Sequence, residues 1–408
     1  MRTRDCHILN MLRAQKKHVS FHTPGHKRSG ADITELDYSD NLASPHGVIA
    51  QAEGDIARIL NAAKSFILTD GSTCGVLSVL YALKSCGVKT VACPAESHVS
   101  VSNGCRLLGL ERVDIPTEER NAIPQQPTKE AAARALSRAD ALLLTSPDYY
   151  GNIPDLDGMA ALCKEAGKPF AIDGAHGAHL HFTPAYAGRY ADLWVDGAHK
   201  SLPALTQGAV VSATADWAEA LGEGVKIFRT TSPSYPVMAS VEYAVKYPRN
   251  PSIERAAEAL KARVGAYENA DWSKIVVPFG EYSDAAQAYL QAHGVYSEFN
   301  DGNHLMFYLS PCTKAGELKK LERLLSRLPR GRVRDCARSF AEIGEKTQYE
   351  EPLSAVGKVC ARECGIFPPC IPLLRQGELV SAEKAKRLAR AKSTFGLKEG
   401  KILVYSEE

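Results

Sequence analysis

The chain has 408 residues, of which 45% are hydrophobic and 24% charged, and its formal net charge is +2. A chain of this length exceeds what one ordinary hydrophobic core organises, so we expect two domains. Because 49 basic residues nearly balance 47 acidic ones, nothing in the charge favours binding to nucleic acid or to an anionic membrane. We expect the partners to be small molecules and further copies of this chain.

The N-terminal stretch is basic and lacks an apolar run of the length that a signal peptide needs. No stretch of about 18 apolar residues follows it, so we expect a cytoplasmic protein. The 11 cysteines are odd in number, and Cys74, Cys86, Cys93 and Cys105 sit in apolar stretches. We therefore expect reduced thiols in the core.

The pattern of elements changes twice along the chain. Residues 1–45 are turn-rich and are predicted to form an N-terminal arm. Over 46–250, short apolar strands alternate with helical stretches, which predicts a large α/β domain with a mostly parallel sheet. The strands are expected at 64–70, 90–95, 141–147, 169–173, 192–198 and 208–214. Residues 251–408 read as a smaller α+β domain.

The segment DGSTCG at 70–75 follows a predicted strand and opens a predicted helix. Gly71 and Gly75 permit close approach of the backbone to a ligand, Ser72 and Thr73 offer hydroxyls, and the helix N-terminus favours an anion. These features suit a phosphate group. The alternative is that Ser72 or Thr73 is only the cap of the helix.

Two consecutive strands end in the same four residues. Asp-Gly-Ala-His at 173–176 ends one strand, and the same letters at 196–199 end the next, with Lys200 directly after. Ligands of open α/β sheets bind beyond the carboxyl ends of the strands, so these groups are expected to converge. A desolvated lysine there becomes a nucleophile.

Three histidines close together, His176, His179 and His181, are a possible metal motif. In an extended segment, alternation would put His179 and His181 on one face and His176 on the other. Since no acidic or cysteine cluster accompanies them in the sequence, we expect no metal site.

The run DGAHKSLPALTQGAVV at 196–211 resembles the Schiff-base lysine segment of the Orn/Lys/Arg decarboxylases, a family of fold type I (aspartate aminotransferase-like) pyridoxal-phosphate enzymes. Further segments occur in the order that this family has: FHTPGHKRSG, DGSTCG, PAESHVSV, TSPDYYGNIPDL, DGAHGAH, TTSPSYPVMASVE and GIFPPCIPLLRQGE. The resemblance implies a fold type I large domain that holds pyridoxal 5'-phosphate, followed by a smaller α+β domain.

The resemblance also implies roles for single residues. Lys200 would bind the cofactor covalently, and Asp173 would face the pyridine nitrogen and keep it protonated. Asp196 is the rival for that role, and we favour Asp173 because the family places the ring partner on the preceding strand. His98 would stack on the ring. His199 would lie near the reacting carbon, where it contacts the substrate carboxylate or delivers a proton.

The remaining cofactor contacts are implied in the same way: Gly71, Ser72 and Thr73 at the phosphate, Ala175 and His176 beside the cofactor, and Ser232 and Ser234 at the phosphate of a neighbouring subunit's site. The chain departs from the family at three positions. Gly197 stands where a phosphate-binding serine or threonine is usual, Cys370 where glycine is usual, and Gln376 where proline is usual.

The implied reaction is α-decarboxylation of a basic amino acid, arginine, lysine or ornithine, to an amine of the polyamine pathway. The implied assembly is a homodimer or larger homo-oligomer with active sites at the subunit interface. Two alternatives stay open. One is another fold type I reaction, by an aminotransferase or a carbon–sulfur lyase, and the other is a catalytically degenerate homologue that acts as a binding or regulatory partner.

Overall fold

A computed structural model describes residues 5–28, 31–334, 338–366 and 372–406. They divide into two compact units, of which the first comprises residues 1–95 and 103–332 and the second residues 96–102 and 333–408. No helix in these four ranges is long and apolar enough to cross a membrane. The departure at Cys370 lies outside the described residues.

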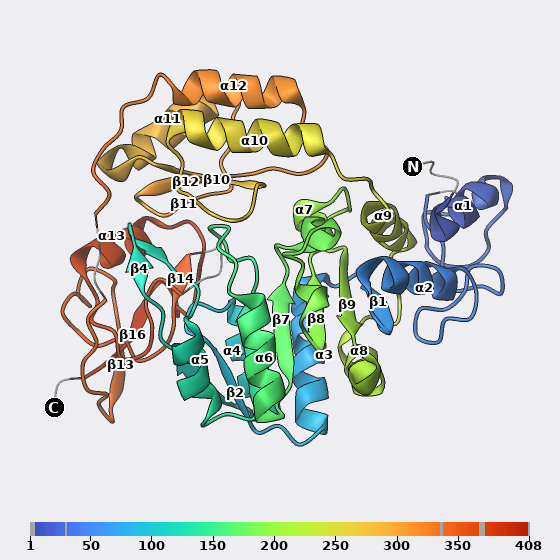
Figure 1. Ribbon diagram of the computed structural model, residues 1–408, viewed down its shortest axis with the longest axis horizontal. Coiled ribbons are helices and arrows are strands. Elements are labelled where there is room, and N and C mark those ends of the chain that lie inside the picture. The colour runs from blue at the N-terminus through green and yellow to red at the C-terminus, as the bar shows by residue number, and fades with distance from the viewer. Residues whose placement is uncertain (1–4, 29–30, 335–337, 367–371, 407–408) are drawn as a thin grey trace. The chain divides into compact units, whose positions relative to one another are not determined.

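The centre of the first unit is a seven-stranded sheet of order β1-β9-β8-β7-β6-β2-β3 (Figure 1). Its strands are β1 (Lys64–Leu68), β2 (Thr90–Pro94), β3 (Glu111–Ile115), β6 (Ala141–Thr145), β7 (Phe170–Gly174), β8 (Leu193–Asp196) and β9 (Ala209–Ala213). The ladders from β8 to β3 are parallel, and β9 runs antiparallel to both its neighbours. The α/β class with a mostly parallel sheet is therefore confirmed, and all six predicted strands occur.

Helices cover this sheet and complete the large core. They are α1 (His7–Ala14), α2 (Val48–Leu60), α3 (Gly71–Ser85), α4 (Val99–Leu108), α5 (Lys129–Leu136), α6 (Leu156–Ala166), α7 (Ala198–Ser201), α8 (Ala218–Phe228) and α9 (Tyr235–Val245). Every residue of β7 is buried, as is typical of a central parallel strand whose two faces are both covered. Cys74, Cys93 and Cys105 are buried free thiols, as expected, but Cys86 is exposed because it is the C-terminal cap of α3.

The first unit also contains a three-stranded antiparallel sheet of order β10-β12-β11. Its strands are β10 (Lys274–Pro278), β11 (Phe299–Asn300) and β12 (His304–Tyr308), and α10 (Pro251–Val264), α11 (Ser283–Ala292) and α12 (Ala315–Leu325) pack on it over a shared apolar core (Figure 1). Asn250 caps α10 at Ile253 N, Pro251 occupies the first turn, and Gly265 ends the helix with a φ of 59°. These residue types are typical of helix ends, so the boundaries of α10 follow from local sequence.

The second unit is small and made mostly of short β-pairs. The pairs are β13 (Thr347–Glu350) with β16 (Ile402–Tyr405), and β14 (Gly365–Ile366) with β15 (Thr394–Phe395); a further hairpin, β4 (Glu119–Arg120) with β5 (Ile123–Pro124), belongs to the first unit. Helix α13 (Ala382–Arg390) is capped by Ser381 and packs on a core that contains Cys360 and Cys364. Gln376, the departure from proline, donates its Nε2 to Tyr405 Oη at 2.8 Å.

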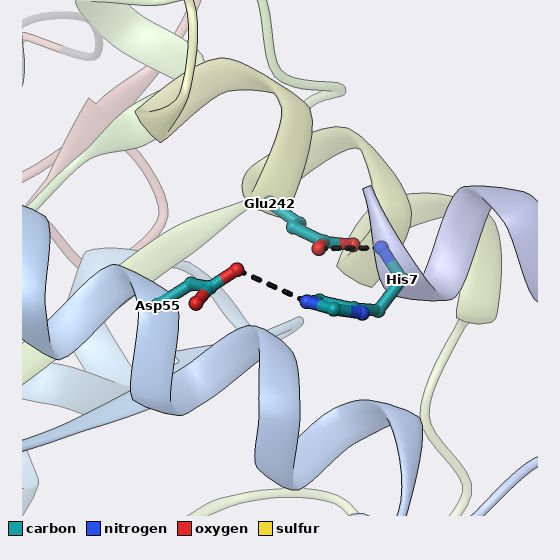
Figure 2. A group of neighbouring side chains, drawn as sticks. All are labelled: His7, Asp55 and Glu242. Atoms are coloured by element: carbon teal, nitrogen blue, oxygen red, sulfur yellow. Dashed lines mark hydrogen bonds and ion pairs between the residues drawn. The ribbon is translucent and has the colours of Figure 1, made fainter. Parts of the chain in front are cut away.

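A polar cluster attaches α1 to the rest of the first unit. His7 Nε2 lies 3.0 Å from Asp55 Oδ2, and the carboxylate of Glu242 accepts from the backbone N–H groups of His7 and Ile8. Figure 2 shows Asp55 of α2 facing the His7 ring and Glu242 of α9 facing the backbone nitrogen of His7. Their ligand atoms lie within 4.8 Å of one another, as in a metal site. However, Lys246 Nζ binds Asp55 Oδ2 at 2.6 Å and Glu242 Oε1 at 2.9 Å. The lysine ammonium is therefore the positive charge that these two carboxylates share.

We predict that Lys246→Met lowers the free energy of unfolding by roughly 3–5 kcal/mol, because it leaves the fully buried Glu242 carboxylate without its counter-ion. Denaturant titration measures the loss. Lys226→Met, on the exposed face of α8, is the control and is expected to change the free energy by no more than about 0.5 kcal/mol. Equal losses in both variants would contradict the assigned role of Lys246.

Candidate active site

The two repeated tetrapeptides end neighbouring strands in register. Strand β7 pairs with β8 in parallel, with Asp173 opposite Val195 and Gly174 opposite Asp196. The polar residues that follow both strands therefore emerge at the same edge of the sheet, as their order in the sequence predicts. Lys200 lies on the short helix α7 directly after β8.

Lys200 and His176 meet at this edge. Lys200 Nζ lies 3.0 Å from His176 Nε2, which is hydrogen-bonding distance, and His176 is buried. The His176 ring contacts two tyrosines: it stacks on Tyr308 at 5.6 Å between centroids with 15° between planes, and its centroid is 4.3 Å from that of Tyr149. The structure thus brings together the two tetrapeptides and two tyrosines that we did not select from the sequence.

The two strand-end aspartates differ in their surroundings. Asp173 is buried, and its Oδ1 accepts from the backbone N–H of Ala175 at 3.1 Å. Asp196 is also buried, and its Oδ2 accepts from Tyr186 Oη at 2.6 Å, while Trp194 Nε1 donates to the same Tyr186 oxygen. Burial raises the pKa of Asp196 to about 7, so this carboxyl is substantially protonated at neutral pH. Tyr186 thus engages one oxygen of Asp196, whereas the other, Oδ1, has no hydrogen-bond partner among the described residues.

His199 has its ring fixed by the backbone. Its Nδ1 lies 2.9 Å from the carbonyl oxygen of Gly208. Since a carbonyl only accepts, Nδ1 carries the proton and Nε2 is the unprotonated nitrogen of the neutral ring. Burial lowers the pKa of His199 below its ordinary value, which favours this neutral form. A neutral imidazole of this kind can accept a proton.

The segment DGSTCG follows β1 and forms the N-terminal end of α3, which begins at Gly71. Asp70 is the cap residue of α3, so the alternative that Ser72 or Thr73 caps the helix is wrong. Gly71 has a φ of +78°, which favours glycine. Thr73 is exposed, whereas Ser72 is buried and its Oγ has no hydrogen-bond partner among the described residues. A buried hydroxyl at a helix N-terminus without a partner suits a ligand.

Gly197 is required by the close approach of the two tetrapeptides. A Cβ atom at this position would lie 2.2 Å from the carbonyl oxygen of Ala175 and 3.0 Å from Ser72 Oγ. The same holds at Gly174, where a Cβ would lie 2.7 Å from the carbonyl oxygen of Val195. The serine or threonine usual in the family is thus absent at position 197 because there is no room for a side chain. The Ser72 hydroxyl lies next to the place that this side chain would occupy.

The other selected residues have local partners or belong to the second unit. His98 belongs to the second unit, where its Nδ1 accepts from the backbone N–H of Ser100 at 3.2 Å. Ser234 caps α9, and Ser232 is exposed. The neighbouring Thr230 donates its backbone N–H to Asp70 Oδ2 at 3.3 Å, which ties this segment to the turn before α3.

The histidine motif is not an extended segment, so the alternation of faces considered for it does not apply. Residues Ala178–Phe182 form a 3-10 helix, because Leu180 N and Thr183 N bond to carbonyls three residues earlier. His179 Nε2 pairs with Asp271 Oδ1 at 2.8 Å, and His181 Nδ1 bonds to the carbonyl oxygen of Ala178. Sequence patterns could not reveal the first pair, since 92 positions separate its members.

Comparison with known proteins identifies the family. The model of the Orn/Lys/Arg decarboxylase major domain matches residues 29–270. The chain belongs to the Orn/Lys/Arg decarboxylase family. The uncharacterized protein YaaO of Bacillus subtilis is 26% identical over 97% of this chain and 97% of its own length. The arginine decarboxylase of the same organism is 28% identical over 61% of this chain and 56% of its length.

The fold agrees with this membership. The crystal structure of the Francisella novicida lysine decarboxylase LdcF superposes with a TM-score of 0.75 at 15% identity, and it covers 98% of this chain and 80% of that protein. The chain therefore has the fold type I architecture of pyridoxal-phosphate enzymes that its sequence predicts.

We predict that Gly197→Ser weakens cofactor binding by about tenfold or more, although it restores the hydroxyl usual in the family, because the new side chain must displace the Ala175 carbonyl. Absorbance titration of the apoprotein with pyridoxal phosphate measures the affinity. Gly54→Ser, on the exposed face of α2 with no atom within 4 Å of the added carbon, controls for loss of glycine. Tighter binding by Gly197→Ser would contradict this explanation.

Proposed function

We propose that this protein is a pyridoxal-phosphate-dependent decarboxylase that removes the α-carboxyl group of arginine, lysine or ornithine. The observation that carries the proposal is the Lys200 amine at the carboxyl end of β8, 3.0 Å from His176 Nε2. It lies in a segment that matches the family model. Membership of the family and the fold support the class of reaction. The restriction to basic amino acids is supported by the names of the relatives, which are arginine and lysine decarboxylases.

The residues at this edge of the sheet fit the cofactor. The partnerless Ser72 hydroxyl and the N-terminus of α3 suit its phosphate, and the Lys200 amine suits its aldehyde. When bound, pyridoxal phosphate supplies a ring that accepts the electron pair left on the α-carbon after loss of CO2. Asp173 is the better partner for the ring nitrogen, because an ionised carboxylate is needed there and Asp196 is engaged by Tyr186.

Two histidines of the chain would act as proton acceptors. Lys200 must lose a proton before its amine attacks a carbonyl carbon, and His176 Nε2 is within reach to accept it. His199, with its proton on Nδ1, offers Nε2 as a second acceptor. We propose that His98 stacks on the ring, and that Ser232 and Ser234 contact the cofactor phosphate bound by a second subunit. The protein would then be a homodimer, and we propose that it acts in the cytoplasm.

We predict that the wild type converts at least one of the three basic amino acids into agmatine, cadaverine or putrescine with release of CO2, and that Lys200→Ala yields none. Mass spectrometry of the products measures this. Lys64→Ala, a lysine that begins β1, is the matched control and is expected to retain the activity. A keto acid in place of CO2 indicates an aminotransferase, and a protein that stays colourless with pyridoxal phosphate indicates a degenerate homologue; either result contradicts the proposal.

We further predict that Asp173→Asn and Asp196→Asn behave differently. Hydrogen bonds to charged groups contribute roughly 1.5–3 kcal/mol, so loss of the Asp173 carboxylate should weaken cofactor binding about 10- to 100-fold. Asp196→Asn keeps an acceptor for Tyr186 and should bind as the wild type does. Absorbance titration compares them, and the reverse order of effects would assign the ring nitrogen to Asp196.

A further inference from the structure

The backbone carbonyl of His176 is held by two side chains from the three-stranded sheet. Tyr308 donates its hydroxyl to this oxygen at 2.9 Å, and Lys274 Nζ lies 3.4 Å from it. Lys274 and Tyr308 are paired across β10 and β12, and the ammonium lies 4.5 Å from the centre of the Tyr308 ring. Two neighbours on adjacent strands thus converge on one atom of the residue that contacts Lys200.

Lys274 is fully buried, and an aspartate compensates its charge. Asp271 Oδ2 lies 2.5 Å from Lys274 Nζ, and Asp271 Oδ1 accepts from His179 Nε2 and from the hydroxyl of Ser273. The side chains of Asp271, His179 and Lys274 have no exposed surface. Although burial favours the neutral acid, His179 and Lys274 hold the pKa of Asp271 well below its usual range. The carboxylate is therefore ionised.

A buried ion pair of this kind is not explained by stability alone. The cost of removing two charges from water commonly equals or exceeds their attraction, and apolar side chains of similar volume serve as well. Here the charged groups fix the position of the turn that follows β7. Asp271 fixes the turn after β7 at His179, and Lys274 and Tyr308 fix the same turn three residues earlier, at His176.

The fixed turn lies against the helix that carries Lys200. The backbone N–H of His179 donates to Ser201 Oγ at 3.2 Å, so the residue after Lys200 is tied to the same turn. With both ends held, the His176 imidazole has little freedom to leave the Lys200 amine. Its ring stacks on Tyr308, whose hydroxyl also binds its carbonyl.

We propose that Lys274 and Tyr308 are positioning residues, which hold the His176 carbonyl and so keep the His176 imidazole where it accepts a proton from Lys200. This inference rests on the proposed function. A lysine attacks an aldehyde only as the neutral amine, and the unprotonated nitrogen of a neutral imidazole can take up the proton. In the capture of pyridoxal phosphate, Lys200 would give one proton to His176. Its neutral amine would then form the N–C bond, and the aldehyde oxygen would leave as water with the two hydrogens that the amine still carries.

The test is the rate at which apoprotein captures pyridoxal phosphate, followed by absorbance from pH 7 to pH 10. Reduction with borohydride and peptide mass spectrometry identify the labelled lysine. We expect Lys274→Met and Tyr308→Phe to capture the cofactor about tenfold more slowly at pH 7. We expect the difference to vanish toward pH 10, because an ordinary lysine, with a pKa of about 10.4, then loses its proton without help.

Two variants are matched controls in the same region. Lys261 donates to the carbonyl of Asp271 at 2.8 Å and to Asn269, so Lys261→Met also removes a buried lysine beside Asp271 but none of the bonds to His176. Tyr267 binds Gln125 and Asn152 through its hydroxyl, so Tyr267→Phe removes a comparable hydroxyl. Both controls are expected to capture the cofactor at the wild-type rate.

The outcomes separate the possible failures. If Lys274→Met does not fold, Tyr308→Phe still decides, because it removes one hydroxyl and keeps the ring. Rates equal to those of the controls at every pH overturn the positioning role, and so does a slower rate that high pH does not restore, since that indicates general structural damage. If the wild type is not labelled at Lys200, the proposed function itself fails.

Discussion

The arrangement of the site depends on the close approach of two parallel strand ends. Strands β7 and β8 run side by side in register, and the turns that follow them touch through backbone atoms at Gly174 and Gly197. A side chain at either glycine would collide with a carbonyl oxygen of the neighbouring strand or turn. This contact is what brings the turn containing His176 within reach of the helix containing Lys200.

Two buried aspartates near this edge illustrate how surroundings set charge. Asp196 accepts from a tyrosine hydroxyl and pairs with no cation among the described residues, and burial raises its pKa to about 7. Asp271 is equally buried, yet His179 and Lys274 keep its pKa well below the ordinary range. The same residue type is thus partly protonated at neutral pH in one place and ionised in the other, because positive groups contact Asp271. Charge at the site follows from contacts that residue type does not specify.

Much of the fold follows from local patterns in the sequence. The six apolar runs became strands, because each is short, rich in branched residues and bounded by turn residues. The placement of the two polar tetrapeptides at the carboxyl ends of β7 and β8 also followed, because residues that end neighbouring parallel strands lie at one edge of the sheet. The alternation considered for His176, His179 and His181 did not apply, because residues 178–182 form a 3-10 helix whose partners include Asp271 and Ser201.

Residue patterns alone predicted the family, the α/β class, and the placement of Lys200, Asp173 and His176 at one edge of the sheet. Three features follow instead from packing in three dimensions: Asp196 accepts from Tyr186, the Ser72 hydroxyl has no partner among the described residues, and Lys274 and Tyr308 reach His176. The reason is distance along the chain. Lys274 and His176 are 98 positions apart, and no periodicity or motif relates residues that meet only when two separate sheets pack together.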